Sequence, residues 1–259
     1  MKSVKLIGLI ISIFFIFISC NKEDVNKHKR LDKITIQMEC VIDGETVSYP
    51  EVNHMVFFWD GKLLSSIDYY DEGEYWWSDV YSYDDQKRVT SIESHGMHRK
   101  TDFLYEGDKL KQAIVKENKN TENCYYTWED NKLSQMTVIY QSGDTSSVVR
   151  FYWNGNNVSK SIHNTIAPAT YSLEYEYDNY LNPFHNLFPF SSLTARTSYN
   201  EHDYGFNQNN VIRALTILDT EEDLHIYTYT YKGKYPDTRT ETVRNGEDVI
   251  KYIYRYYYK

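Results

Sequence analysis

The sequence predicts an all-β fold, an antiparallel meander of hairpins that curls into a barrel-like, soluble domain. The first observation behind this prediction is that 26 of the 259 residues are tyrosine, because aromatic and β-branched residues favour strands. The second is a short aromatic phrase that recurs at steps of 22 to 25 residues, with one longer step of 29. The third is a low content of Ala and Leu, which favour helices. Together these observations indicate a repeat architecture built from strands.

Residues 1–19 have the features of a signal peptide. Two lysines precede an apolar run over residues 6–18, which is too short to cross a hydrocarbon core about 30 Å thick as a helix. The run ends in Ile18-Ser19-Cys20, and this ending resembles the lipobox of bacterial lipoproteins. In that family the leader is cut off before the cysteine, so the resemblance implies that Cys20 becomes the first, acylated residue. An ordinary signal peptide and a single N-terminal membrane helix are the alternatives.

The residues that follow, Lys22-Glu23-Asp24, resemble the surface-export signal of Bacteroidota lipoproteins. The resemblance implies a lipid anchor in the outer membrane and a protein that faces the cell exterior; retention on the inner leaflet is the alternative. Polar residues continue to about position 32, as in a flexible tether. We therefore expect a lipidated cysteine and tether over residues 20–32 and one β-hairpin repeat domain over residues 33–259.

The recurring phrase reads aromatic, any residue, aromatic, turn pair, basic residue or Asn, aliphatic. Its second aromatic stands at positions 59, 83, 105, 128, 153, 177, 206, 231 and 254. Aromatics two apart share one face of a strand, and Asp-Gly, Glu-Gly and Asn-Gly pairs suit the tight turn of a hairpin. Each repeat therefore holds two strands, which gives about 16–18 strands over the domain.

The strand after each turn carries two apolar residues whose spacing varies. The spacing is four for Leu63 and Ile67 and three for Val89 and Ile92. Because side chains alternate between the faces of a strand, a spacing of four keeps one face and a spacing of three reverses it. We expect a β-bulge in the copies with the shorter spacing, or a register that tolerates both.

These phrases resemble the tyrosine-aspartate (YD) repeats of the RHS class, which build strips of hairpins that curl on themselves. Two stretches, YDNYLNPF over residues 177–184 and YKGKYPDTRTET over residues 231–242, resemble a Bacteroidota lipoprotein family of unknown function with a porin-like fold. The resemblance covers roughly residues 33–259 and implies a curled, barrel-like antiparallel sheet. It implies no known activity, and the repeats are too few for the toxin-enclosing shells of the RHS class.

The 29-residue step contains NPFHNLFPF, residues 182–190. Pro183 and Pro189 break a strand ladder, so we expect a non-strand insert with apolar side chains. We predict that this insert plugs or caps one opening of the curled sheet; a lid over a ligand is the alternative.

The charge of the chain excludes some partners. Without residues 1–19 it has 26 basic and 37 acidic residues and a net charge of −11, which disfavours nucleic acid as a partner. A membrane-spanning barrel is disfavoured too, because residues 240–259 carry charges on both faces of the predicted strands. Apart from Cys20, only Cys40 and Cys124 are present. An oxidising envelope would permit a disulfide between them, and two free thiols fit the sequence equally well.

The sequence shows no motif for catalysis, a cofactor or a metal. Metalloprotease, nucleophile-elbow and nucleotide-binding patterns are missing. His95 and His98 have no third ligand nearby, and the acidic stretch over residues 68–79 lacks the alternating spacing of a calcium loop. We therefore expect no enzymatic activity, no cofactor and no metal; a hydrolase whose carboxylates the sequence does not single out is the alternative.

Two aromatic runs provide the candidate binding residues, Tyr75-Trp76-Trp77 and Tyr256-Tyr257-Tyr258. Because neighbours along a strand point to opposite faces, each run places a ring away from the core. Such a ring can stack on a sugar or contact protein side chains, unless both faces of the sheet are covered. We predict a non-catalytic surface lipoprotein that binds a glycan or a protein. A structural or assembly role in the outer membrane is the second interpretation.

Overall fold

The computed structural model describes residues 29–42, 45–165, 170–185, 187, 205–218, 221–245 and 248–259. These residues form seventeen strands and contain no helix long and apolar enough to cross a membrane. Cys20 and the Lys22-Glu23-Asp24 stretch lie outside the described residues. The strands are β1 (Leu31–Ile42), β2 (Glu45–Ser48), β3 (Val52–Asp60), β4 (Leu63–Asp71), β5 (Glu74–Tyr83), β6 (Val89–His95), β7 (Arg99–Glu106), β8 (Lys109–Glu117), β9 (Asn120–Glu129), β10 (Lys132–Tyr140), β11 (Thr145–Asn154), β12 (Asn157–Thr165), β13 (Thr170–Leu181), β14 (Asn209–Leu218), β15 (Glu221–Lys232), β16 (Tyr235–Asn245) and β17 (Asp248–Tyr258).

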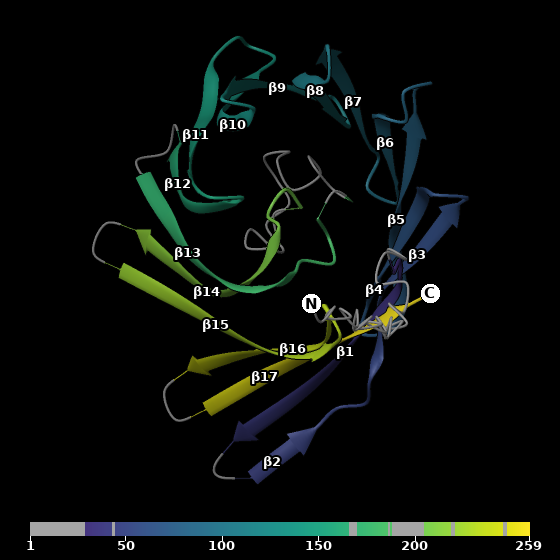
Figure 1. The fold of residues 1–259 in the computed structure, drawn as a ribbon, viewed down its shortest axis with the longest axis vertical. Helices are drawn as coiled ribbons and strands as arrows, with labels where there is room; N and C mark the ends of the chain where they lie inside the picture. The colour runs from purple at the N-terminus through teal and green to yellow at the C-terminus, as the bar shows by residue number, and fades with distance from the viewer. Residues whose placement is uncertain are drawn as a thin grey trace, which may run out of the picture.

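The strands form a closed barrel (Figure 1). From β3 to β17 each strand pairs antiparallel with the next one in the sequence. β1 closes the ring by pairing with both β17 and β3. The short strand β2 pairs with the last part of β1 and adds a small extension to the sixteen-stranded ring. The all-β antiparallel meander predicted from the sequence is therefore confirmed.

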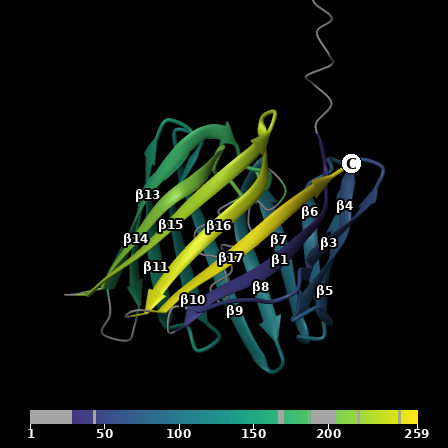
Figure 2. The same cartoon turned by 90° about the horizontal axis from the view of Figure 1, so that it is seen from below.

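The two ends of the barrel differ. We call one the terminal end: there the backbones of Arg30 and Lys259 pair through hydrogen bonds of 3.1 and 3.0 Å, next to the turn at Gly61. The opposite end, the distal end, carries the turns at Gly73 and Gly96. The strands run obliquely between the two ends (Figure 2). The described chain therefore begins and ends at the terminal end.

The core fills the inside of the barrel. Buried residues alternate with more exposed ones along much of the ring, as in β5, where Asp79 and Tyr81 are buried and Val80 is 39% exposed. Large apolar side chains such as Phe57 and Ile67 are almost fully buried. The alternation follows from the two-residue period of a strand with one covered face.

Aromatic side chains connect neighbouring hairpins at the terminal end. The ladder between β4 and β5 stops at Ser66 and Val80, short of Leu64, whose carbonyl accepts a 2.7 Å hydrogen bond from the Tyr83 hydroxyl instead. Because an unpaired buried carbonyl is costly, the ring supplies the donor that the missing strand pairing would have given. Eight such bonds of 2.6–2.9 Å follow one another around the barrel: Trp59 to Leu31, Tyr83 to Leu64, Tyr105 to Val89, Trp128 to Leu110, Trp153 to Leu133, Tyr177 to Val158, Tyr229 to Val211 and Tyr258 to Pro236.

A β-bulge lies beside these bonds in seven hairpins. In the β7–β8 hairpin, Tyr105 faces Leu110 while Leu104 faces Gln112, so Lys111 is the extra residue. The bulge therefore also occurs in repeats with the spacing of four, where we did not expect it. After Leu110, Val158 and Val211 the inward residue is the one at spacing three, for example the fully buried Ala113. In the copy at Leu63 the inward residues are instead Leu64 and Ile67.

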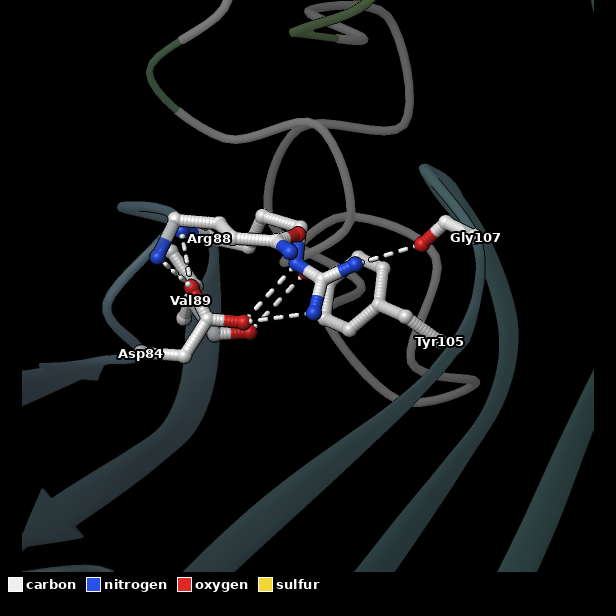
Figure 3. A network of polar contacts seen from close by, with 6 residues as sticks. Asp84, Arg88, Val89, Tyr105 and Gly107 are labelled. Carbon is white, nitrogen blue, oxygen red and sulfur yellow. Dashed lines mark hydrogen bonds and ion pairs between the residues drawn. The ribbon is translucent and has the colours of Figure 1, made fainter.

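The basic residue that stands before the aliphatic residue of the phrase contacts the turn of the next repeat. The Arg88 side chain forms a 2.7 Å ion pair with Asp84, donates to the Gly107 carbonyl and lies 4.6 Å from the Tyr105 ring centre (Figure 3). The Arg88 backbone N–H and then its side chain lower the pKa of Asp84 by hydrogen bonding to it. The carbonyl and ring contacts recur where Arg30 meets Gly61 and Trp59 and where Lys132 meets Gly155 and Trp153.

The described residues between β13 and β14 lie inside the barrel (Figure 1). Phe206 packs 5.8 Å from Phe151 and 5.5 Å from Trp153. Phe184 is 8% exposed and lies 6.5 Å from Tyr256. These contacts agree with an insert that fills one opening, and the prediction for Pro189 and its apolar neighbours falls outside the described residues.

One copy of the phrase differs from the sequence prediction. Phe206 lies in a turn, and β14 begins only at Asn209. The bridging donors of the last two repeats are Tyr229 and Tyr258, not the second aromatics of the phrase that serve in the earlier repeats. Cys40 and Cys124 are both buried free thiols, which answers the question that the sequence left open.

Candidate functional site

Several polar side chains are buried on the inner wall toward the distal end. Asp79, Ser94, Thr101 and Glu122 are each at most 6% exposed and lie on β5, β6, β7 and β9. Buried polar groups are costly unless they are paired. The distal end therefore departs from the apolar repeat pattern, and we take it as the candidate functional region.

Asp79 is the centre of a hydrogen-bonded group. Its carboxylate accepts a 2.5 Å bond from the Ser94 hydroxyl and a 3.1 Å bond from the Tyr69 hydroxyl. Burial raises the pKa of Asp79, and the bonds from Ser94 and Tyr69 and the charge of Arg99 oppose this rise. The group joins β4, β5, β6 and β7 and fixes the wall behind the rim.

Three rings stand on this wall at the rim. Trp77 stacks on Tyr69 with ring centres 4.5 Å apart, and Trp76 meets Trp77 edge-on at 4.3 Å. Tyr69 faces Trp77 and Tyr70 faces Tyr75 in the β4–β5 ladder, so Trp76 is the extra residue of a bulge. We expected the two tryptophans to point to opposite faces; instead the bulge brings their rings together.

The outer rings of this cluster remain accessible. Trp76 is 48% exposed and Tyr75 is 54% exposed, whereas Trp77 has one face covered by Tyr69. Tyr75 is held by a 3.2 Å hydrogen bond from its hydroxyl to Ser78. Trp76 and Tyr75 are therefore the members that can contact a ligand, and Trp77 supports them.

An open cleft of about 440 Å³ adjoins the cluster, and we call it the distal cleft. Gly96, at its edge, touches the tryptophans: a Cβ at this position would lie 3.2 Å from the Trp76 carbonyl oxygen and 3.2 Å from the Trp77 Cβ. Ser94 links the cleft to the Asp79 group. The cleft is lined by Glu93, Ser94, His95, Gly96, His98, Arg99, Lys100, Lys116 and Asn118.

The charges of the distal cleft are paired with one another. Lys100 and Lys116 face each other across the β7–β8 ladder, and each contacts the Asp102 carboxylate at 3.2 Å. Like charges on facing residues repel, and a shared carboxylate offsets that repulsion. Glu93 lies opposite Lys100 in the β6–β7 ladder. Arg99 stabilises the ionised form of the Asp79 group described above.

His95 and His98 both line the distal cleft. In the part of the chain that the structure describes, no three His, Cys, Asp or Glu side chains come close enough to hold a metal ion together. Exposed rings, imidazoles, an amide and paired charges are groups that bind a ligand through stacking and hydrogen bonds.

The C-terminal tyrosines do not join this site. Tyr256 is buried and the Tyr258 hydroxyl donates to Pro236, so both rings serve the barrel at its terminal end. Tyr257 is 38% exposed, but Lys33 covers its ring at 4.7 Å and its hydroxyl donates to Glu51 at 2.8 Å. Of the two predicted aromatic runs, only Tyr75-Trp76-Trp77 lies beside a cleft.

Sequence reasoning missed the polar members of the site. Asp79, Ser94 and Arg99 come from three strands, and only the barrel register brings them together. One signal was available: Asp79 stands two residues before the buried Tyr81 and therefore on the inward face. A charged residue at a core position is a candidate for function.

Comparison with solved structures finds the same fold in a porin-like protein from Bacteroides uniformis ATCC 8492. That crystal structure matches with a TM-score of 0.57 and 12% sequence identity, covering 88% of this chain and 98% of that chain. A porin-like protein from Bacteroides vulgatus ATCC 8482 matches with a TM-score of 0.43 and 8% identity, covering 89% and 99%. No protein-family model matches the sequence, and no curated protein matches it.

The porin-like fold of the Bacteroides uniformis structure agrees with the fold that the resemblance in the sequence implies. The lipoprotein assignment and the relationship to YD repeats stay predictions. At this level of identity the likeness concerns the fold alone, so function has to be argued from the residues of this chain.

Proposed function

We propose that this protein is a lipid-anchored, surface-exposed protein of the outer membrane that binds a glycan at its distal rim without catalysis. The observation that carries the proposal is the exposed pair Tyr75 and Trp76, in the run whose Trp76 backbone and Trp77 Cβ lie against Gly96 of the distal cleft. Flat rings with weakly solvated faces stack well on the C–H faces of sugars. A protein ligand is the alternative occupant, and a purely structural role gives no reason for such rings at the rim.

The position of the tether supports an outward-facing site. The chain enters the barrel at Arg30, which pairs with Lys259 at the terminal end, and an anchor on Cys20 would lie on that side. Strands of 7 to 12 residues in the ring, at about 3.3 Å per residue and tilted as in barrels, place the distal rim roughly 25 Å from the terminal end. An anchored barrel would therefore hold Trp76 away from the lipid.

The outer wall supports a barrel that stands in water. Ion pairs between outward side chains join Lys160 to Glu174 at 2.8 Å and Arg213 to Glu176 at 2.9 Å, in the middle of β12, β13 and β14. A Lys or Arg facing lipid near the midplane costs about 2–4 kcal/mol. A wall with such pairs at mid-strand is suited to solvent, although the fold is porin-like.

A glycan array with the full chain tests the proposal. We expect Trp76→Ala to weaken the binding of the array hits about tenfold or more, because stacking on an exposed ring supplies much of the contact. Tyr152→Ala is the matched control: Tyr152 is 47% exposed on the outer wall, against 48% for Trp76, and its loss leaves binding unchanged. Equal effects of the two substitutions contradict the site. Shortening of a bound glycan during incubation contradicts the non-catalytic role.

A further inference from the structure

The acidic surface of the chain and the paired charges of the distal cleft restrict the ligand. The whole sequence has a net charge of −9, so a polyanion that approaches is repelled over most of the surface. A site for an acidic ligand would need cations without partners. The distal cleft has three cationic side chains, Arg99, Lys100 and Lys116, and the state of each one decides what the cleft can attract.

Lys100 and Lys116 are held by one carboxylate. Asp102 lies 3.2 Å from both ammonium groups, and Glu93 faces Lys100 from the neighbouring strand. Two cations therefore meet two anions within one small patch. An acidic ligand would have to compete with Asp102 for the lysines and would lie close to both carboxylates.

Arg99 differs from the two lysines. It lies opposite Glu117 in the β7–β8 ladder, and its charge favours the ionised form of the buried Asp79 carboxylate. Its Nε is buried and has no hydrogen-bond partner among the described residues. A buried Nε does not reach a ligand in the open cleft, so the exposed lysines and their carboxylates decide which charge the cleft attracts.

We infer that the ligand of the distal rim is a neutral glycan, an inference that rests on the proposed glycan-binding function. Trp76 and Tyr75 offer ring faces to the sugar, and Asn118 and the imidazoles of His95 and His98 offer hydrogen bonds to its hydroxyl groups. Contacts of this kind need no net charge on the ligand. They also lose little strength in salt, because screening weakens interactions between charges.

Matched glycan pairs test the inference with the full chain. The probes are a galacturonan hexasaccharide and its fully methyl-esterified form, together with the neutral xylohexaose and mannohexaose. We expect the chain to bind a neutral probe, to favour the ester over the free acid, and to keep the neutral affinity within about twofold between 50 and 500 mM NaCl. Trp76→Ala weakens this binding about tenfold or more.

A charge variant provides a gain of function. Asp102→Asn leaves Lys100 and Lys116 without their shared carboxylate, so affinity for the free-acid probe should rise about threefold or more at low salt, with the neutral affinity unchanged. Glu174→Gln is the matched control, since it frees Lys160 on the outer wall and should change neither affinity.

Each result bears on the inference. A wild-type preference for the free acid that fades with salt overturns it while leaving glycan binding in place. Absence of any acid gain in Asp102→Asn, in a chain that folds with an unchanged circular dichroism spectrum, overturns the view that paired charges set the preference. Failure to bind every probe contradicts glycan binding itself, and the inference with it.

Discussion

The second aromatic of the phrase is a Tyr or a Trp in six successive repeats, from Trp59 to Tyr177. Both residues combine a large apolar ring with a hydrogen-bond donor, and Phe lacks the donor. The structure uses both properties, because the ring packs against the core and the donor reaches the carbonyl of the preceding hairpin. Phe206, the exception in the series, lies in a turn and not in a strand.

Removing a single donor tests this role. Tyr83→Phe keeps the ring and leaves the Leu64 carbonyl without its 2.7 Å partner, so the free energy of unfolding should fall by about 1 kcal/mol. Urea denaturation followed by circular dichroism measures the change. Tyr152→Phe removes a hydroxyl from a ring that is 47% exposed and should stay within about 0.5 kcal/mol of the wild type. Equal losses of unfolding free energy in both variants would show that the bridging hydroxyl has no special role.

At the scale of elements, the turns of the two ends have different tasks. Turns at the terminal end are held by cations from the preceding repeat, as Arg88 holds Gly107. At the distal end Gly96 has a φ of +97° and lies against Trp76 and Trp77. A residue with a Cβ is strained at this φ and would also press on the aromatic cluster.

Gly96→Ala and Gly143→Ala separate these two effects. Gly143 has a similar φ of +92°, and a Cβ there would meet nothing within 4 Å. Both variants should lose about 1–2 kcal/mol of stability from backbone strain. Only Gly96→Ala should shift the tryptophan fluorescence spectrum and weaken glycan binding. Matching spectra and affinities in the two variants would show that Gly96 does not position the rings.

The hairpins could be predicted from the sequence because an aromatic pair and a turn are local signals. The bulges could not be predicted in every repeat, since Ala113 and Ser161 are small or polar and yet fully buried, while larger apolar neighbours face outward. The sequence also identified the aromatic run Tyr75-Trp76-Trp77, because neighbouring side chains on a strand cannot all face the core. The sequence did not identify Asp79 and Ser94, because the contact between them depends on the pairing of β5 with β6.

At the scale of the whole molecule, the barrel closes by itself and its outer wall carries ion pairs. A covalent lipid would then be what holds the protein on the membrane, as the sequence around Cys20 predicts. This arrangement separates the fold from the anchor, so each can be removed without the other.

Cys20→Ala should move the protein from the membrane fraction to the soluble fraction without loss of the β-sheet circular dichroism spectrum. Cys40→Ala is the matched control, because Cys40 is a buried thiol in β1 that is 6% exposed. That variant should remain with the membrane. A Cys20→Ala protein that stays in the membrane fraction and needs detergent for extraction would point to a barrel embedded in lipid.

The pairing of Arg30 with Lys259 lies where β1 meets β17, and the barrel closes only when these two strands pair. β1 is made early and its partner β17 last, so closure joins the two most distant strands of the described chain, and such contacts form slowly. Until then the sheet is an open strip with two bare edges, which are prone to pair with other chains. A chain cut before Asp248 would lack the eleven residues of β17, so the edges of β1 and β16 that β17 covers would stay open to other chains.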